Sequence, residues 1–118
     1  MTGTDTASWH DKSWVVGITA NGRSKAYDWN RLRRERAVND IVGGTAIVLA
    51  LGTDSTSYFA FERPDSTTLF SLEGDSLVTT VGRYALNGRG TAGTLVAIAA
   101  GQEFWHSWRT FQPATEHY

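Results

Sequence analysis

The chain has no cysteine, and only two prolines and one methionine occur among its 118 residues. The absence of cysteine excludes disulfides, thiolate metal sites and a cysteine nucleophile, but it leaves the cellular compartment open. Long hydrophobic runs are also missing. The longest apolar stretch, Thr45–Leu51, has the length of a strand, whereas a membrane span needs about 20 apolar residues. We therefore expect no membrane span. The formal net charge is only -1, so we also expect no nucleic-acid partner.

The composition that remains is that of a small globular protein. Apolar residues make up 41% of the chain and charged residues 19%, which suits one domain with a modest core. Residues 1–12 are rich in Thr, Ser, Gly and Asp. They lack the apolar core of a signal peptide. We therefore expect a flexible arm over residues 1–12 and a single mainly-β domain over residues 13–118.

Short β-branched and aromatic segments separated by turn residues predict strands. The pair Asn21-Gly22 stands between "WVVGIT" and "RSKAYDW", and Asn-Gly is the strongest short signal for a β-hairpin. "VNDIVGG" followed by "TAIVLAL" is a second candidate hairpin. Further strands are expected over residues 56–63, 67–74, 76–82 and 94–100.

Two segments favour helices. Residues 30–38 contain helix formers behind a potential cap, Asn30, and predict one short helical turn. Near the end of the chain, Phe104, Trp108 and Phe111 have helical spacing, and Pro113 stops that helix. The sequence therefore predicts a small barrel or sandwich of short antiparallel strands with one or two short helices, one of them C-terminal.

Two motifs have structural explanations. "GRGTAG" matches the dinucleotide pattern G-x-G-x-x-G, but the segment after it is β-like, which favours glycine-rich turns. "RLRRER" is typical of the solvated face of a helix. The alternative is that these arginines bind an acidic surface of a partner. No catalytic set is complete, so no catalytic residue, metal or cofactor is assigned.

The stretch "VNDIVGG" leaves two alternatives open. Asn, Asp and Gly-Gly suit a structured corner between strands. Alternatively, Asn39 and Asp40 present polar groups to a cleft, and Gly43-Gly44 lets a ligand approach. Glu62 and Arg63 could face the same cleft, where two carboxylates could bind a hard cation.

His106, between Trp105 and Ser107, is the histidine of most interest. Aromatic neighbours could lower its pKa by desolvation and make it a base or a ligand. The alternative is an exposed side chain on the far side of an aromatic helix.

Several motifs occur in an order that resembles the domain of unknown function 3179 family: "NGRSKAYDW", "VNDIVGG", "SYFAFER" and "EFWHSWRTFQPATEHY". The likeness covers residues 14–118. Many relatives look exported or lipid-anchored, which implies an extracytoplasmic location. One branch carries a Cys-Pro-x-Cys motif, but the matching region here, "ALGTDSTSYFAF", has no cysteine. The chain therefore resembles a cysteine-less branch to which thiol chemistry does not transfer. The shared positions are Tyr27, Asn39, Asp40, Gly43, Gly44, Glu62, Arg63, Trp105 and Trp108.

Three functions are carried forward. The first is a non-enzymatic, extracytoplasmic binding or accessory module for a small polar ligand or a partner protein. The second is a metal-dependent or redox-related enzyme with a cleft around Asp40, Glu62 and His106. The third is a structural subunit that self-associates. The ligand or cleft candidates are Tyr27, Asn39, Asp40, Gly43, Gly44, Glu62, Arg63, Trp105 and His106.

Overall fold

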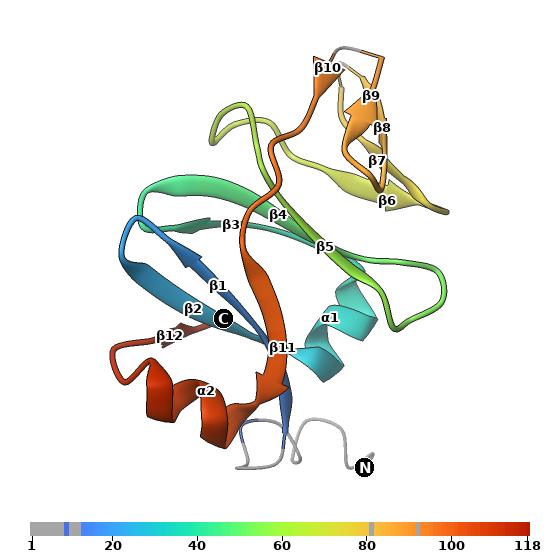
Figure 1. Ribbon diagram of the computed structural model, residues 1–118. Helices are drawn as coiled ribbons and strands as arrows, with labels where there is room; N and C mark the ends of the chain where they lie inside the picture. The colour runs from blue at the N-terminus through green and yellow to red at the C-terminus, as the bar shows by residue number, and fades with distance from the viewer. Residues whose placement is uncertain (1–8, 10–12, 81, 92) are drawn as a thin grey trace.

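The computed structural model describes Trp9 and residues 13–80, 82–91 and 93–118. This part of the chain forms short strands and two helices, and it confirms the predicted mainly-β fold with a C-terminal helix (Figure 1). The predicted arm over residues 1–12 lies, apart from Trp9, outside the described residues.

The first sheet is built on the hairpin of β1 (Trp14–Ala20) and β2 (Arg23–Asp28). Its two turn residues, Asn21 and Gly22, have positive φ angles of 51° and 74°, as the tight turn of a two-residue hairpin requires. This hairpin was predicted from its Asn-Gly pair and is confirmed. Two C-terminal strands flank it: β11 (Ala100–Phe104) pairs antiparallel with β1, and β12 (Glu116–His117) pairs parallel with β2.

The second sheet has the order β3-β4-β5, with bounds Ala37–Val42, Thr45–Leu51 and Tyr58–Glu62. Gly43 and Gly44 form the turn between β3 and β4, with φ angles of 56° and 80°. "VNDIV" is therefore strand, and only the Gly-Gly pair is turn.

The first two sheets are joined into a partly closed barrel. The segment 96–98 runs along β5, with hydrogen bonds from Glu62 N to Val96 O and from Ile98 N to Ala60 O, and then leads into β11. Among the described residues, no ladder pairs β3 with β2 or β12, so the barrel has an open seam there. Its interior is filled by Val16, Ile18, Tyr27, Leu32, Val38, Val42, Ile47, Leu49, Leu51 and Ala60.

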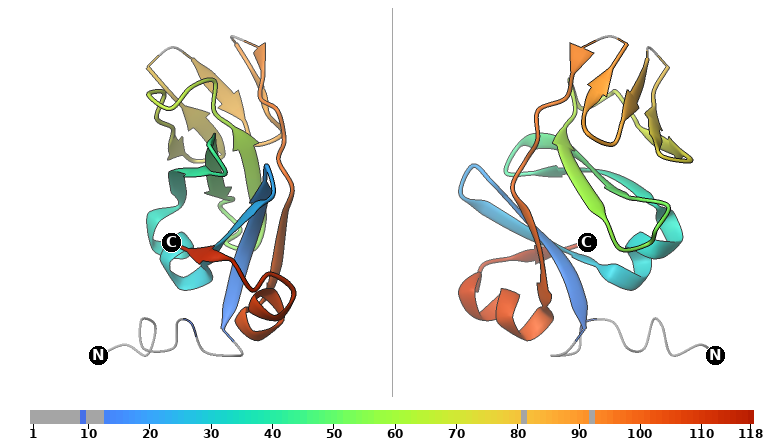
Figure 2. Two further views of the ribbon diagram at one scale, coloured as in Figure 1. Left: turned by 90° about the vertical axis from the view of Figure 1, so that its left-hand side faces the viewer. Right: turned by 45° about the vertical axis from the view of Figure 1, so that its right-hand side comes forward.

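A small third sheet is inserted between β5 and β11. Its order is β10-β9-β8-β7-β6, with bounds Gly93–Thr94, Arg89–Gly90, Arg83–Ala85, Ser76–Val78 and Ser71–Glu73. A second apolar cluster packs it against the outer face of β4 and β5 and consists of Val48, Ala50, Phe61, Phe70, Leu77, Tyr84 and Leu95. In both views of Figure 2 this sheet and the C-terminal helix lie at opposite ends of the molecule.

Both helices are short, with seven residues each. Helix α1 (Trp29–Glu35) begins after Asp28, whose carboxylate caps it by accepting from Arg31 N at 3.0 Å. Helix α2 (Trp105–Phe111) covers the outside of the first sheet, where Trp108 lies on Gly17. A Cβ atom at Gly17 would lie 2.3 Å from the Trp108 ring, so the close approach requires glycine.

The predicted aromatic face of the C-terminal helix is correct for Trp108 and wrong for Phe104 and Phe111. Phe104 is the last residue of β11 and pairs with Trp14, since the β1–β11 ladder extends that far. Phe111 is in the helix but is 77% exposed. The buried helical side chains are instead Trp105 and Trp108, which are three residues apart and share a face.

Two further boundaries differ from the prediction. The first helix ends at Glu35, and Ala37 already belongs to β3 because it pairs with Ala50 of β4. The predicted strand over residues 94–100 is largely irregular, with an isolated bridge at Ala97. In both places, pairing with distant segments decides the local structure.

Candidate functional site

The candidate site lies at the open seam of the barrel, where the two hairpin turns meet. The Asn21 side-chain amide donates to Gly43 O at 2.9 Å and to Thr45 Oγ1 at 2.8 Å. A Cβ atom at Gly43 would lie 2.2 Å from Ala20 O. Glycine at position 43 thus provides both the positive φ angle and the room for two backbones to approach.

A cleft of about 520 Å³ opens beside these turns. Its lining residues come from both hairpins and from the C-terminal strand: Asn21, Arg23, Ile41, Gly43, Gly44 and Glu116. Arg23 and Glu116 are exposed and carry opposite charges, and Ile41 adds an apolar surface that is 48% exposed. We call this feature the seam cleft. Its volume falls in the range typical of small-molecule sites, about 300–1,000 Å³.

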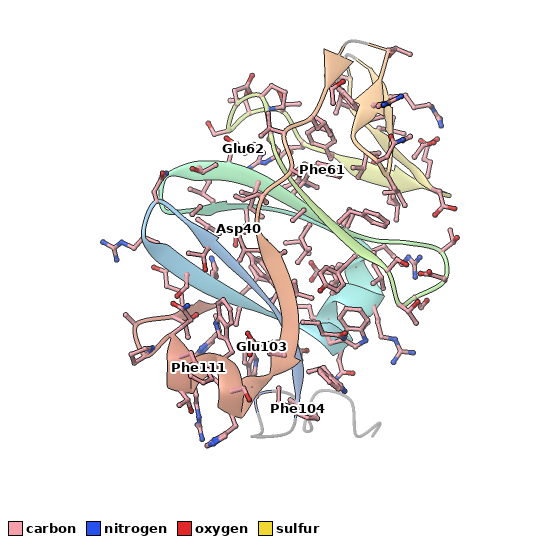
Figure 3. The ribbon with its side chains drawn as sticks, in the orientation of Figure 1. Asp40, Phe61, Glu62, Glu103, Phe104 and Phe111 are labelled. Carbon is pink, nitrogen blue, oxygen red and sulfur yellow. The ribbon has the colours of Figure 1, made fainter. Side chains whose placement is uncertain are left out.

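The next residues along the seam form a hydrogen-bonded polar cluster around Asp40. The ammonium of Lys25 lies 2.8 Å from Asp40 Oδ2, and the Tyr27 hydroxyl donates to the same oxygen at 2.9 Å. Burial by itself would raise the pKa of Asp40, but the hydrogen bonds from Lys25, the Ile41 N–H and Tyr27 outweigh burial and lower this pKa. Asp40 is therefore an anion held by its neighbours. Figure 3 labels it on β3.

The pKa of Tyr27 is shifted in the opposite direction. Burial, followed by the negative charge of Asp40 and the hydrogen bond to it, raises the pKa of Tyr27 well above its usual value. The hydroxyl therefore stays protonated and donates to Asp40 across the physiological range. Tyr27 is 1% exposed and its ring belongs to the barrel core, so this residue connects the core to the polar seam.

Tyr118 covers this cluster from the C-terminal side. Its ring centroid is 5.3 Å from that of Tyr27. The Arg31 guanidinium carbon lies 4.1 Å from the centroid of the Tyr118 ring, and the Lys25 ammonium 5.7 Å from it. Both are cation–π distances. The backbone N–H of Tyr118 donates to Ala26 O at 2.9 Å, so the final residue is bound to β2 as well as to the cations.

Two sequence candidates organise the segment after β5. The Asn39 side chain donates to Phe70 O and accepts from Phe70 N, both at 2.8 Å. Arg63 is 7% exposed, and its guanidinium donates to four backbone carbonyl oxygens, one of them Asp40 O at 2.8 Å. Both side chains are thus engaged in holding the chain around β3.

The remaining candidates lie apart from the seam cleft. Ile47 on the central strand β4 pairs with Asp40 of β3 on one side and with Glu62 of β5 on the other. Glu62 is exposed. His106 is exposed on α2, whereas its neighbour Trp105 is buried against the outer face of β1 and β2. Within the described ranges, no group of three or more His, Asp or Glu side chains could hold a metal ion.

Sequence reasoning missed the charged residues of the cleft, Arg23 and Glu116, and the neighbouring Lys25 of the polar cluster. Arg23 and Lys25 stand in an alternating strand with no motif, and Glu116 is about 90 positions away along the chain. They come together because β12 pairs with β2 and places Glu116 beside Lys25. The one available signal was the alternation of "RSKAYD", which puts positions 23, 25 and 27 on one face.

The fold and the cleft define a class: a small, partly closed β-barrel with an inserted sheet and a polar cleft at its seam. The chain belongs to the family described as protein of unknown function (DUF3179), whose sequence model matches residues 1–115. The resemblance found in the motifs is thereby confirmed. No curated protein and no solved structure gives a significant match. No helix in the described ranges has both the length and the apolar character that crossing a bilayer requires.

Proposed function

We propose that the protein is a non-enzymatic binding module that captures a small polar ligand in the seam cleft. The observation that carries this proposal is the cleft itself, a hollow of about 520 Å³ with an exposed cation, Arg23, and an exposed anion, Glu116, on its lining. Opposite charges at one opening suit a zwitterion, which can place its own anionic group at Arg23 and its cationic group at Glu116.

The residues around the seam cleft favour ligand binding over catalysis. Asp40, which precedes the cleft residue Ile41 on β3, is occupied by Lys25 and Tyr27, and its lowered pKa makes it a poor proton acceptor. The turns that frame the cleft are fixed to each other by Asn21. A preformed, rigid site of this kind lowers the ordering cost of binding.

The enzyme alternative gains no support from the placement of its residues. It requires Asp40, Glu62 and His106 to act on one substrate. Asp40 is engaged within the seam, Glu62 lies two strands away, and His106 is on the helix that covers the other face of the first sheet.

A partner protein is the second candidate occupant, and the free edge of β3 favours it. In the described chain β3 is paired on one side only, by β4. Ile41 on this strand is 48% exposed and lines the cleft. An extended segment of a partner could add to such an edge as a further strand, with a side chain in the cleft.

The test is a titration of the ¹⁵N-labelled protein with glycylglycine, a zwitterionic probe. We expect saturable shifts of the Gly22, Gly43 and Gly44 amides, and a loss of these shifts in Arg23→Gln. Arg33→Gln, an exposed change on α1, serves as the matched control and should bind as the unmodified chain does. Unmoved cleft amides, or equal binding by Arg23→Gln, would refute the zwitterion site.

We also place this activity outside the cytoplasm, on the family resemblance alone. Fractionation of the source cells with an antibody against the protein tests this placement. Recovery with the cytoplasmic markers would overturn it without affecting the binding proposal.

A further inference from the structure

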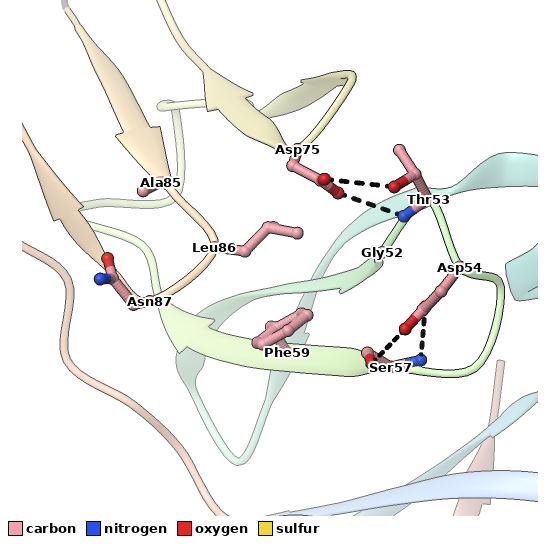
Figure 4. Close-up of a pocket in the computed structure, with 9 residues that line it drawn as sticks. All are labelled: Gly52, Thr53, Asp54, Ser57, Phe59, Asp75, Ala85, Leu86 and Asn87. Atoms are coloured by element: carbon pink, nitrogen blue, oxygen red, sulfur yellow. Dashed lines mark hydrogen bonds between the residues drawn. The ribbon is translucent and has the colours of Figure 1, made fainter.

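A second hollow lies away from the seam, between the barrel and the inserted sheet (Figure 4). It is a groove of about 410 Å³, lined on one side by the β4–β5 loop and the start of β5 and on the other by Asp75 and the β8–β9 turn. A smaller hollow of about 300 Å³ adjoins it and shares Phe59, Leu86 and Asn87. The two hollows thus lie side by side along β5, and we call them together the groove.

The two ends of the groove differ in chemistry. Asp54, Asp75 and the hydroxyl residues Thr53 and Ser57 lie at the loop end. The floor and the far end are apolar, lined by Tyr58, Phe59, Phe61, Leu86, Ala97 and Ile98. In Figure 4 the side chains of Phe59 and Leu86 lie between Asn87 and the two aspartates. A polar end joined to an aromatic floor is the arrangement of sites that bind amphipathic small molecules.

The aspartates at the polar end are held in place by donors of the β4–β5 loop. Asp54 accepts hydrogen bonds from Thr56 N at 3.0 Å, Ser57 N at 2.9 Å and Ser57 Oγ at 2.6 Å. Asp75 accepts from Thr53 N at 3.2 Å and Thr53 Oγ1 at 3.1 Å. The bonds from Ser57 and Thr56 keep the pKa of Asp54 well below its usual range, so this carboxylate is ionised at any physiological pH.

Among the residues that the structure describes, neither Asp54 nor Asp75 forms an ion pair with a cationic side chain. Ion pairs elsewhere in the molecule join Lys25 to Asp40, Arg31 to Glu35 and Arg83 to Glu73. The cation next to this loop, Arg36, donates to Gly52 O at 2.7 Å and to Ser55 Oγ at 3.3 Å and does not line the groove. The polar end therefore carries negative charge that a ligand can complement.

We propose that this groove binds a small organic cation with an apolar or aromatic body. A protonated amine faces Asp54 and Asp75 at the loop end. The body of the ligand lies on Phe59 and Leu86, where dispersion and burial of apolar surface stabilise it. The negative charge of the aspartates selects a cationic head group, and the aromatic floor selects an apolar body. Binding of the ligand therefore requires both features.

The first test uses the unmodified protein and three ligands of one shape. Phenethylammonium, neutral 2-phenylethanol and anionic 3-phenylpropionate are titrated in turn into ¹⁵N-labelled protein. We expect saturable shifts of the Thr53, Asp75 and Asn87 amides with the cation, weaker binding of the alcohol, and none of the anion. Added salt should weaken the binding of the cation only. Equal affinity for the cation and the alcohol would refute the role of the aspartates, and unmoved groove amides would refute the site.

The second test compares two aspartates in similar loops. Asp54→Asn removes a charge from the groove, where Asp54 accepts from Thr56 N and Ser57 N, and we expect the dissociation constant for phenethylammonium to rise by about three- to fivefold, as an exposed ion pair allows. Asp65→Asn is the matched control, since Asp65 also accepts from the residues that follow it but lies outside the groove. An equal loss in both variants would contradict the proposal. The seam cleft reports on different amides, so the two binding proposals can fail independently.

Discussion

Arg63 offers the sharpest test of how the barrel holds its inserted segment. Its side chain donates to Ile47 O at 2.8 Å, Ser66 O at 3.2 Å, Thr68 O at 3.1 Å and Asp40 O at 2.8 Å. The residue is 7% exposed, so replacement by methionine leaves the aliphatic packing largely intact but removes every donor. Arg63→Met thus separates the hydrogen bonds from the volume.

The expected loss of stability follows from the number of bonds. Four hydrogen bonds at a net value of about 1 kcal/mol each would contribute about 4 kcal/mol. Relief of the desolvation cost of the guanidinium offsets part of this sum. We expect Arg63→Met to lower the free energy of unfolding by about 3 kcal/mol and the Tm by roughly 10 °C.

Urea denaturation followed by tryptophan fluorescence measures the change. Arg33→Met, at an exposed position of α1, should stay within about 0.5 kcal/mol of the unmodified protein. Arg63→Lys should also be destabilised, because one ammonium cannot reach four carbonyls arranged around a planar guanidinium. A loss below about 1 kcal/mol in Arg63→Met, or full stability of Arg63→Lys, would refute the reasoning.

Two further predictions concern packing and pH. Gly17→Ala places a Cβ atom 2.3 Å from the Trp108 ring and should lower the free energy of unfolding by about 1–3 kcal/mol through overpacking. Gly101→Ala, on the neighbouring strand, has nothing within 4 Å of the new atom and should lower it clearly less in the same denaturation assay. Equal losses in the two variants would contradict the packing argument. The raised pKa of Tyr27 stabilises the fold fully below the unfolded pKa of 10.0 and less as the pH rises above it. Tyr27→Phe should therefore flatten the alkaline decline of stability above pH 10, and an unchanged slope in pH-dependent urea melts would show that Tyr27 does not titrate abnormally.

Local signals in the sequence determined the turns and the fold class. Asn21-Gly22 and Gly43-Gly44 each close a hairpin because these residues accept positive φ angles at low cost. The aromatic and β-branched segments around them form the strands of a mainly-β fold. The C-terminal helix was also visible in the sequence, but its first residue and its buried face were not. Phe104 has the same helical spacing whether or not a ladder to β1 holds it in a strand.

Only the tertiary structure decided what the polar residues do. Asp40 stands in a motif that fits a ligand site, yet its charge is held by Lys25 and Tyr27 from another sheet. Arg63 follows an aromatic strand, and its acceptors lie on β3, on β4 and in the segment that follows it.

The seam cleft and the groove share this origin, because each is lined by segments that are distant along the chain. A strand's alternation fixes which side chains share a face, but the facing strand is set by the register and order of the sheets. These depend on the packing of the whole core and leave no local trace in the sequence.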